Sequence, residues 1–252
     1  MSQNVLVVHG GGPTAVINAS LYGVIEEAKR NPEVGKVYGA IGGTGAIFSE
    51  TFIDLTSFDD EKLKLLLHTP ASAIGSSRYP LYEKDYEKMV DIFKKHDIKY
   101  VLLNGGNGTM DACGHIYEVC KDQDIKVVGI PKTIDNDIAM TDHSPGYGSA
   151  ARFIAASTQE VGEDVKSLPI HVCIMEAMGR NAGWITAASA LARRKQGDAP
   201  HLIYLPERNF NEDEFLEDVS RLQKKQGGVV VLVSEGLHDA NGESIVPPIF
   251  KS

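Results

Sequence analysis

Residues 5–30 read VLVVHGGGPTAVINASLYGVIEEAKR and decide the fold class. The apolar run at 5–8 predicts a buried strand, and a glycine-rich turn follows it at 9–14. Apolar residues then recur at 17, 21, 24, 25 and 28, which is the spacing of one helix face, and Pro32 stops the helix. A strand, a glycine turn and a helix in this order are typical of a parallel βαβ unit.

The same alternation continues along the rest of the chain. Short apolar runs that predict strands alternate with segments of helical period, which is the pattern of a parallel sheet covered by helices. The sequence therefore predicts an α/β protein. The predicted strands lie at 37–41, 100–103, 126–130, 170–176, 202–205 and 229–233. The predicted helices lie near 86–93, 149–160 and 182–193, with a last one capped by Asn211 whose core face is Phe215, Leu216, Val219 and Leu222.

Length and composition limit the classes of function. The chain has 252 residues, between the length of one domain and that of two, and we expect domains at 1–140 and 141–252. Its net charge of -9 disfavours nucleic acid as a partner. Apolar runs fall short of the roughly 18 residues that span a membrane, and no signal peptide precedes the strand at 5–8.

The cysteines also favour a reducing compartment. Cys113, Cys120 and Cys173 form no CxxC pair, and we expect them to be free thiols in the protein interior. Together with the absence of a signal peptide or a membrane span, this predicts a cytoplasmic protein without a membrane partner.

Two glycine-rich turns are candidates for phosphate binding. In an open α/β sheet, ligands bind beyond the carboxyl ends of the strands. Residues 9–14 (HGGGPT) and 104–110 (NGGNGTM) both lead from a strand into a helix. Glycines let the backbone approach an anion, and a helix N-terminus attracts it, so the pair predicts a ligand with more than one phosphate. A tight turn without a ligand is the alternative at either position.

Two other strand ends carry charged side chains. Residues 131–137 (PKTIDND) place a lysine and a threonine beside two carboxylates, which suits a general base, a second acidic group and a charge clamp. Residues 176–184 (EAMGRNAGW) bring Arg180 to a strand end, where its guanidinium can bind phosphate at two points. Arg78 lies on another loop, and Glu235 follows the last strand.

The combination of these motifs resembles the phosphofructokinase family, from residue 4 to about residue 237. The motifs that carry the resemblance are GGNGT at 105–109, PKTIDND at 131–137, MGR at 178–180 and SEG at 234–236. GGPTAVIN at 11–18 and HSPGYGSAA at 143–151 look most like the diphosphate-dependent branch. The NAD kinase relatives share a similar glycine turn but not the whole set.

The resemblance implies a fold and a reaction. The fold would be two Rossmann-like lobes with parallel sheets flanked by helices, a donor-phosphate lobe at 1–140 and a sugar-phosphate lobe at 141–252. The reaction would be the Mg²⁺-dependent transfer of a phosphoryl group from diphosphate or ATP to the 1-hydroxyl of fructose 6-phosphate. Phosphoryl transfer needs positioning and charge neutralisation more than covalent chemistry, which suits these motifs.

The resemblance also implies roles for individual residues. Asp135 would take the hydroxyl proton, with Thr133 and Asp137 positioning substrate and base, and Lys132 and Arg180 as further catalytic residues. The donor phosphates would be bound by Gly12, Arg78, Gly106 and Gly108. The sugar phosphate and the sugar would be bound by Met178, Gly179, Arg180 and Glu235.

The choice of phosphoryl donor depends on one position. Family members that use diphosphate typically combine a lysine at the position of Lys132 with an aspartate at the position of Gly108, which repels the α-phosphate of ATP. This chain has the lysine but leaves room for the α-phosphate. Thr44 stands where ATP users often have an aromatic residue. We therefore expect diphosphate as the donor, with ATP as the alternative.

Three departures from the family pattern leave other functions open. Asn107 occupies the position of a magnesium-binding aspartate in many members, and an amide is a poorer ligand for Mg²⁺. His171 stands in place of an arginine that reaches the neighbouring subunit of the homodimer or homotetramer that the resemblance implies. The chain also lacks the Gln-Arg-Gly-Gly-like segment of the family, so we expect it to be the front part of a longer enzyme with its C-terminal part missing.

Two rival functions follow from these departures and from the first glycine turn. The first is a non-catalytic sugar-phosphate-binding or regulatory protein of the same fold. The second is a dinucleotide-dependent oxidoreductase, which rests only on the glycine turn at 9–14, because the acidic ribose partner about 20 residues further on is not evident.

Overall fold

The computed structural model describes residues 3–245, and its contacts divide the chain into two units. Unit 1 ends at Thr133 and unit 2 begins at Ile134. The division comes before the boundary that the sequence predicted at residue 140, because Ile134 packs against the apolar core of unit 2. The acidic turn at 135–137 therefore belongs to unit 2.

Unit 1 is built on a five-stranded sheet with the strand order β3-β2-β1-β4-β5. All neighbouring strands are parallel except β3, which is antiparallel to β2 and was not predicted from the sequence. The strands are β1 (Gln3–Gly10), β2 (Val34–Ala40), β3 (Phe52–Asp54), β4 (Ile98–Gly105) and β5 (Lys126–Pro131).

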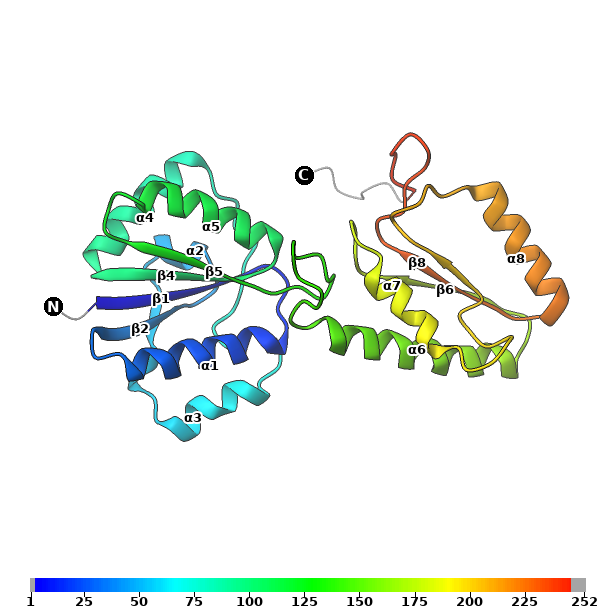
Figure 1. The fold of residues 1–252 in the computed structure, drawn as a ribbon, viewed down its shortest axis with the longest axis horizontal. Helices are drawn as coiled ribbons and strands as arrows, with labels where there is room; N and C mark the ends of the chain where they lie inside the picture. The colour runs from blue at the N-terminus through cyan, green and yellow to red at the C-terminus, as the bar shows by residue number, and fades with distance from the viewer. Residues whose placement is uncertain (1–2, 246–252) are drawn as a thin grey trace. The chain divides into compact units, whose positions relative to one another are not determined.

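Helices cover both faces of this sheet, with α1 and α3 on one side and α4 and α5 on the other (Figure 1). Leu6 and Val8 of β1 pack against α4 and α5, whereas Val5 and Val7 pack against α1. A strand that is buried on both faces is apolar throughout, which explains the run at 5–8. The helices are α1 (Ala15–Arg30), α2 (Gly45–Phe48), α3 (Asp60–Lys64), α4 (Glu83–Lys95) and α5 (Asn107–Cys120), with 3-10 turns at Leu55–Ser57 and Leu65–His68.

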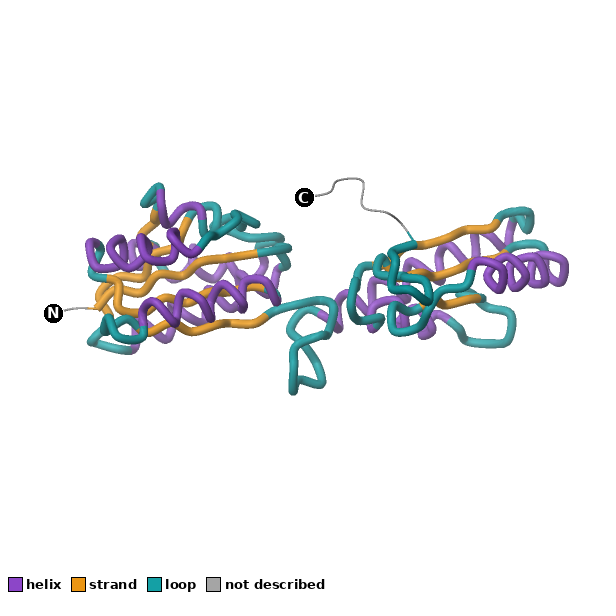
Figure 2. The backbone as a smooth tube through the Cα atoms, turned by 90° about the horizontal axis from the view of Figure 1, so that it is seen from above, coloured by secondary structure: helices purple, strands orange, loops and turns teal. Residues whose placement is uncertain are grey.

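Unit 2 has a three-stranded parallel sheet in the order β6-β8-β7. Helices α6 and α7 form its core with the inner face of the strands, and the strands of each unit run between helices in Figure 2. The elements are β6 (Val172–Ala177), β7 (Leu202–Tyr204), β8 (Val229–Ser234), α6 (Tyr147–Ser167), α7 (Trp184–Ala188) and α8 (Glu212–Gln226), with a 3-10 turn at Ser189–Ala192. The predicted α/β architecture with parallel sheets and flanking helices is confirmed.

Two helices of unit 2 differ from their predictions. The helix predicted at 182–193 ends at Ala188 and continues as the 3-10 turn. Asn211 caps α8 as predicted, because its side chain accepts a hydrogen bond from the amide of Glu214 at 3.2 Å. The predicted core face of α8 is wrong at Leu216, which is 54% exposed, whereas Phe215, Val219 and Leu222 are half-buried.

All three cysteines are free thiols, as predicted. Cys113 and Cys120 lie on one face of α5 and are buried in the core of unit 1, whereas Cys173 of β6 is half-buried. Burial raises the pKa of Cys120 to about 11, so this thiol stays protonated at neutral pH.

Candidate functional site

Three of the predicted motifs meet at one edge of the sheet of unit 1. Strands β1, β4 and β5 are neighbours, and their last residues pair in register, Gly10 with Gly105 and Gly105 with Pro131. Because parallel strands end at the same edge, the turns that follow them lie side by side. The sheet thus brings together the two glycine turns and the start of the PKTIDND segment.

The glycines of these turns are needed for different reasons. A side-chain carbon at Gly10 or Gly105 would collide with the hydroxyl of Thr109, so both positions allow the two turns to pack closely. Gly11 has a φ of +73°, a left-handed conformation that favours glycine. Gly12 differs, because a side-chain carbon there would meet no atom within 4 Å. Packing within unit 1 therefore does not require a glycine at position 12.

Helix α5 begins at Asn107, within the second glycine-rich segment. Its N-cap is Gly106, which has no side chain to bond the first amides of the helix, and a side-chain carbon at Gly108 would meet no atom within 4 Å. The N-terminus of a helix carries free amide groups and the positive end of the helix dipole. This end of α5 therefore combines open space with a preference for anions.

The loop that carries Arg78 is attached to the first glycine turn. The hydroxyl of Ser76 donates to the carbonyl oxygen of Gly11 at 2.7 Å, and the amide of Gly11 donates to the carbonyl oxygen of Ser77 at 3.1 Å. Arg78 follows these contacts and is exposed. Sequence reasoning identified Arg78 but not the two serines that hold its loop, because their partner lies about 65 residues away in the chain.

Lys132 and Thr133 are held at the same edge. The amide of Lys132 donates to the carbonyl oxygen of Gly105 at 2.9 Å, which continues the pairing of β4 and β5 by one residue. The two side chains are 6% and 7% exposed. A buried lysine brings a positive charge into a region where few waters screen it, which strengthens its attraction for an anion.

In unit 2, the acidic turn is organised by the residue between its carboxylates. Asn136 has a φ of +58° and is buried. Its side-chain oxygen accepts from the amide of Ser144 at 2.7 Å, and its side-chain nitrogen donates to the carbonyl oxygen of Asp142 at 3.2 Å. Asp135 and Asp137, both half-buried, flank this clamp. Sequence reasoning quoted Asn136 within the motif but assigned it no role.

The remaining predicted residues of unit 2 meet at the ends of β6 and β8. These strands are neighbours, and the carboxylate of Glu235 accepts from the amide of Gly179 at 3.1 Å. The hydroxyl of Ser234 donates to the carbonyl oxygen of Gly179 at 2.6 Å. Gly179 has a φ of +117°, and a side-chain carbon at Gly236 would collide with the carbonyl oxygen of Arg180. These contacts thus hold the turn after β6 against the turn after β8.

Met178 and Arg180 lie on either side of Gly179 and are exposed. Their side chains are available to a ligand, whereas Gly179 between them is buried and contributes its backbone. Unit 2 therefore presents a guanidinium and a thioether next to the carboxylate of Glu235.

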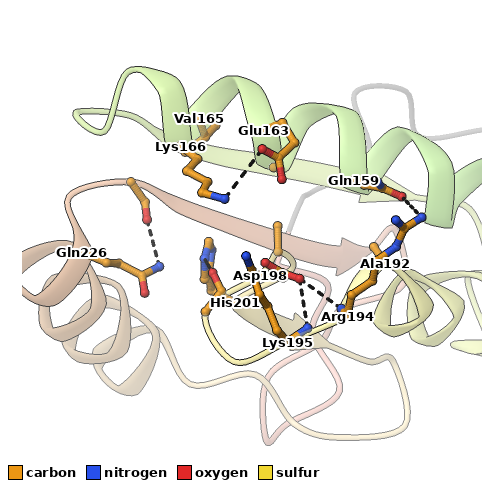
Figure 3. A pocket seen from close by; sticks show the side chains of 14 residues that line it. Gln159, Glu163, Val165, Lys166, Ala192, Arg194, Lys195, Asp198, His201 and Gln226 are labelled. Carbon is orange, nitrogen blue, oxygen red and sulfur yellow. Dashed lines mark hydrogen bonds and ion pairs between the residues drawn. The ribbon is translucent and has the colours of Figure 1, made fainter.

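A cavity of about 530 Å³ in unit 2 contains none of the predicted site residues (Figure 3). It lies between α6 and the segment around residue 198, and hydrogen bonds and one ion pair join residues of its lining. The carboxylate of Asp198 accepts from the amides of Arg194 and Lys195 at 3.1 and 3.0 Å, and Lys166 faces Glu163 at 3.7 Å (Figure 3).

No protein-built metal site is found among residues 3–245, where no three His, Cys, Asp or Glu side chains gather to hold an ion. Within the same residues, no helix is long and apolar enough to cross a membrane. Asn107, the predicted metal ligand, lies at the start of α5 and is exposed.

Comparison with known proteins gives a consistent result. The family model described as phosphofructokinase matches residues 4–251. A pyrophosphate–fructose 6-phosphate 1-phosphotransferase from Rhodospirillum rubrum is 44% identical over 244 residues, covering 96% of this chain and 60% of the relative. The enzyme of the same name from Halomonas elongata is 40% identical over 251 residues, covering 95% and 60%.

A solved structure supports the same relationship. The pyrophosphate-dependent phosphofructokinase from Nitrosospira multiformis matches with a TM-score of 0.87 and 38% identity, covering 96% of this chain and 63% of that one. The chain thus spans about 60% of the length of the curated relatives it matches.

Proposed function

The chain belongs to the phosphofructokinase family, as its motifs predicted, and on that premise we propose that it transfers a phosphoryl group from diphosphate to the 1-hydroxyl of fructose 6-phosphate. The observation that carries this proposal is the hydrogen bond of 2.9 Å from the Lys132 amide to Gly105, which fixes the start of PKTIDND beside the glycine turns. The start of the segment that we assign to acid–base chemistry thereby lies next to backbone that a phosphate can approach.

We assign donor-phosphate binding to unit 1. Gly12, Gly106 and Gly108 offer backbone that a phosphate can approach, and Arg78 and Lys132 offer positive charge. The binding of two adjoining phosphates by two adjacent turns is supported by the register of β1 and β4. Charge neutralisation of this kind is the main contribution that a protein makes to phosphoryl transfer.

We assign sugar binding and proton removal to unit 2 and to the residue just before it. Asp135 would accept the proton of the attacking hydroxyl, and Asp137 and Thr133 would orient Asp135 and the sugar. Met178, Gly179, Arg180 and Glu235 would bind the sugar phosphate and a sugar hydroxyl. The clamp of Asn136 supports these roles, because a general base must be held within hydrogen-bond distance of the proton it removes.

Diphosphate is the donor that we favour, and ATP is the alternative. Two relatives that are 44% and 40% identical to this chain are named for pyrophosphate as the donor. The open space at Gly108 favours the alternative, because among the described residues a side-chain carbon there would meet no atom within 4 Å. A two-donor assay separates the alternatives.

We propose Mg²⁺ as the metal. The chain offers Asn107 near the donor turns, with an amide oxygen, and Mg²⁺ takes few protein ligands when phosphates and waters complete its shell. These donors fit a hard cation. When bound, Mg²⁺ would neutralise charge that develops on the transferred group. A cytoplasmic location and assembly as a homodimer or homotetramer, in which the exposed His171 would approach a second copy, complete the proposal.

The test is the formation of fructose 1,6-bisphosphate by this chain with diphosphate and with ATP, for the natural sequence and for Asp135→Asn. We expect product with diphosphate and a loss of rate of about 10²-fold or more in Asp135→Asn, since general base catalysis typically contributes that much. Asp142→Asn, in the same loop but with only its backbone in the clamp, is the matched control and should keep its rate.

The second candidate is a non-catalytic sugar-phosphate-binding protein, which the neutral Asn107 favours. Calorimetric binding of fructose 6-phosphate without product from either donor would support this candidate and overturn the catalytic proposal.

A further inference from the structure

His9 is a buried titratable residue that the proposed reaction does not use. It lies at the end of β1, immediately before the first glycine turn, and its side chain is 0% exposed. Its ring nitrogen Nδ1 lies 2.8 Å from the hydroxyl oxygen of Ser72. That hydroxyl donates its single proton to the carbonyl oxygen of Gly75 at 2.7 Å. Ser72 must therefore accept from His9, and His9 carries its proton on Nδ1.

The other ring nitrogen has a donor as its neighbour. Nε2 of His9 lies 3.4 Å from the amide nitrogen of Asn104, which also donates to the carbonyl oxygen of Ile17 at 2.9 Å. An amide nitrogen has two protons, so one can reach Ile17 and the other can point at Nε2. This arrangement requires an unprotonated Nε2. Burial lowers the pKa of His9 to about 4, which agrees with a neutral ring.

The bond from His9 reaches the loop that carries Arg78. Ser72 begins the turn that leads to Gly75, and the next residue, Ser76, bonds back to Gly11 at 2.7 Å. His9, Gly10 and Gly11 of one short segment thus all contact the loop, since Gly10 also forms a β-bridge with Ser77. Further anchors come from the amide of Gly42, which donates to the carbonyl oxygen of Ile74 at 2.8 Å, and from the buried Asn18, whose side-chain oxygen accepts from the amide of Ala73 at 2.8 Å.

We propose that His9 is a positioning residue that holds the 72–78 loop against the first glycine turn, and so sets the affinity of unit 1 for a ligand with adjoining phosphates. The proposal rests on the proposed function only in the identity of that ligand. No charged side chain is among the groups bonded to His9, which are a hydroxyl and a carboxamide. His9 therefore acts through the geometry of Arg78 and of the Gly11 backbone rather than through charge.

The structure supplies two matched variants. In His9→Asn, the side-chain nitrogen lies close to the place of Nδ1 and can still donate to Ser72. In His9→Phe, the ring volume is kept and the donor is lost. Both proteins are compared with the natural sequence by calorimetric titration with diphosphate and with fructose 6-phosphate, and by hydrogen exchange of three amides. The amides of Gly11 and Gly75 donate to the loop carbonyl oxygens of Ser77 and Ser72, and the amide of Ala73 in the loop donates to the side chain of Asn18.

We expect His9→Phe to bind diphosphate about tenfold more weakly than the natural protein, since the loss of one hydrogen bond is typically worth about one tenfold step. The affinity of His9→Asn for diphosphate should stay within about threefold of the natural value. Neither substitution should change the affinity for fructose 6-phosphate. Amide exchange should rise in the loop of His9→Phe and stay unchanged in the core of β4. Equal diphosphate affinity in the two variants, or a rise of exchange spread over the whole sheet, would overturn the proposal.

One measurement on the natural protein tests the proposed tautomer of His9 independently of the variants. Nitrogen-15 NMR of the imidazole ring should show a proton on Nδ1 and none on Nε2, and the opposite tautomer or an imidazolium at neutral pH would overturn the proposal. If the natural protein binds no diphosphate, the proposed function fails at unit 1, and the exchange and tautomer results still decide whether His9 holds the loop.

Discussion

The clamp of Asn136 permits a prediction whose size follows from its geometry. Asn136→Ala removes two hydrogen bonds, of 2.7 and 3.2 Å, each worth about 1 kcal/mol net. It also replaces a residue that tolerates the left-handed φ of +58° by alanine, which tolerates it less well, at a further cost of about 1 kcal/mol. The loop should therefore open about 3 kcal/mol more easily. Asn136→Gly loses the two bonds without the backbone cost, about 2 kcal/mol.

The assay is hydrogen exchange of the Ser144 amide, which is fully buried and donates to Asn136. Since 1.4 kcal/mol is a tenfold change in an equilibrium, exchange should be about 150-fold faster in Asn136→Ala and about 30-fold faster in Asn136→Gly. Asn136→Asp keeps the oxygen that Ser144 bonds and should change exchange by only about fivefold.

The amide of Val8 in β1 of unit 1 is the internal control and should exchange at its natural rate in all three variants. The reasoning would be refuted by equal exchange of Ser144 in the natural protein and in Asn136→Ala. It would also be refuted if Asn136→Gly opened as easily as Asn136→Ala, because the left-handed backbone would then cost nothing.

Three further predictions concern unit 1. Gly11→Ala should lower the free energy of unfolding by about 1 kcal/mol because of the φ of +73°. Gly12→Ala should change the free energy of unfolding by less than about 0.5 kcal/mol and should weaken diphosphate binding. Denaturant unfolding measures the stabilities and calorimetry the binding, and equal destabilisation by the two substitutions would contradict the different reasons given for these glycines. In the two-donor assay, Gly108→Asp should abolish any use of ATP and keep the use of diphosphate. The fold should tolerate the substitution, since a side-chain carbon there meets no atom within 4 Å and an acidic residue suits a helix N-terminus. Retained use of ATP would show that position 108 does not control the choice of donor. Between pH 6.5 and about 4, the unfolded chain binds a proton at His9 that the folded chain does not bind, because burial lowers the pKa of His9. This residue should therefore lower the free energy of unfolding by about 1.4 kcal/mol per pH unit as the pH falls. The free energy of unfolding of His9→Asn should depend less steeply on pH, and parallel pH profiles of the two proteins would rule out this contribution of His9.

Most of the strands could be predicted from local sequence, although β3 could not. A strand buried on both faces must be apolar along its length, and a helix on a sheet must be apolar on one face, so β1, α1, β4 and β5 were visible as patterns. The motifs of the candidate site were visible for a related reason, because ligands bind where such strands end.

Contacts between distant segments could not be predicted in this way. His9 meets Ser72 across 63 residues, and Ser76 meets Gly11 across 65, and no local pattern marks either pair. Exposure on α8 was also beyond the sequence, since an apolar stripe looks the same whether or not the fold covers each of its residues. The earlier boundary between the units depends on the packing of one residue, Ile134.

The position of that boundary has a consequence for synthesis on the ribosome. All the strands and helices of unit 1 come from residues before Ile134, and β5, which pairs with β4 at the end of its sheet, is the last strand to be made. The two glycine turns can therefore be in place before β5 adds Lys132 to them. At about 5–20 residues per second, unit 1 can then fold several seconds before β8 of unit 2 leaves the ribosome.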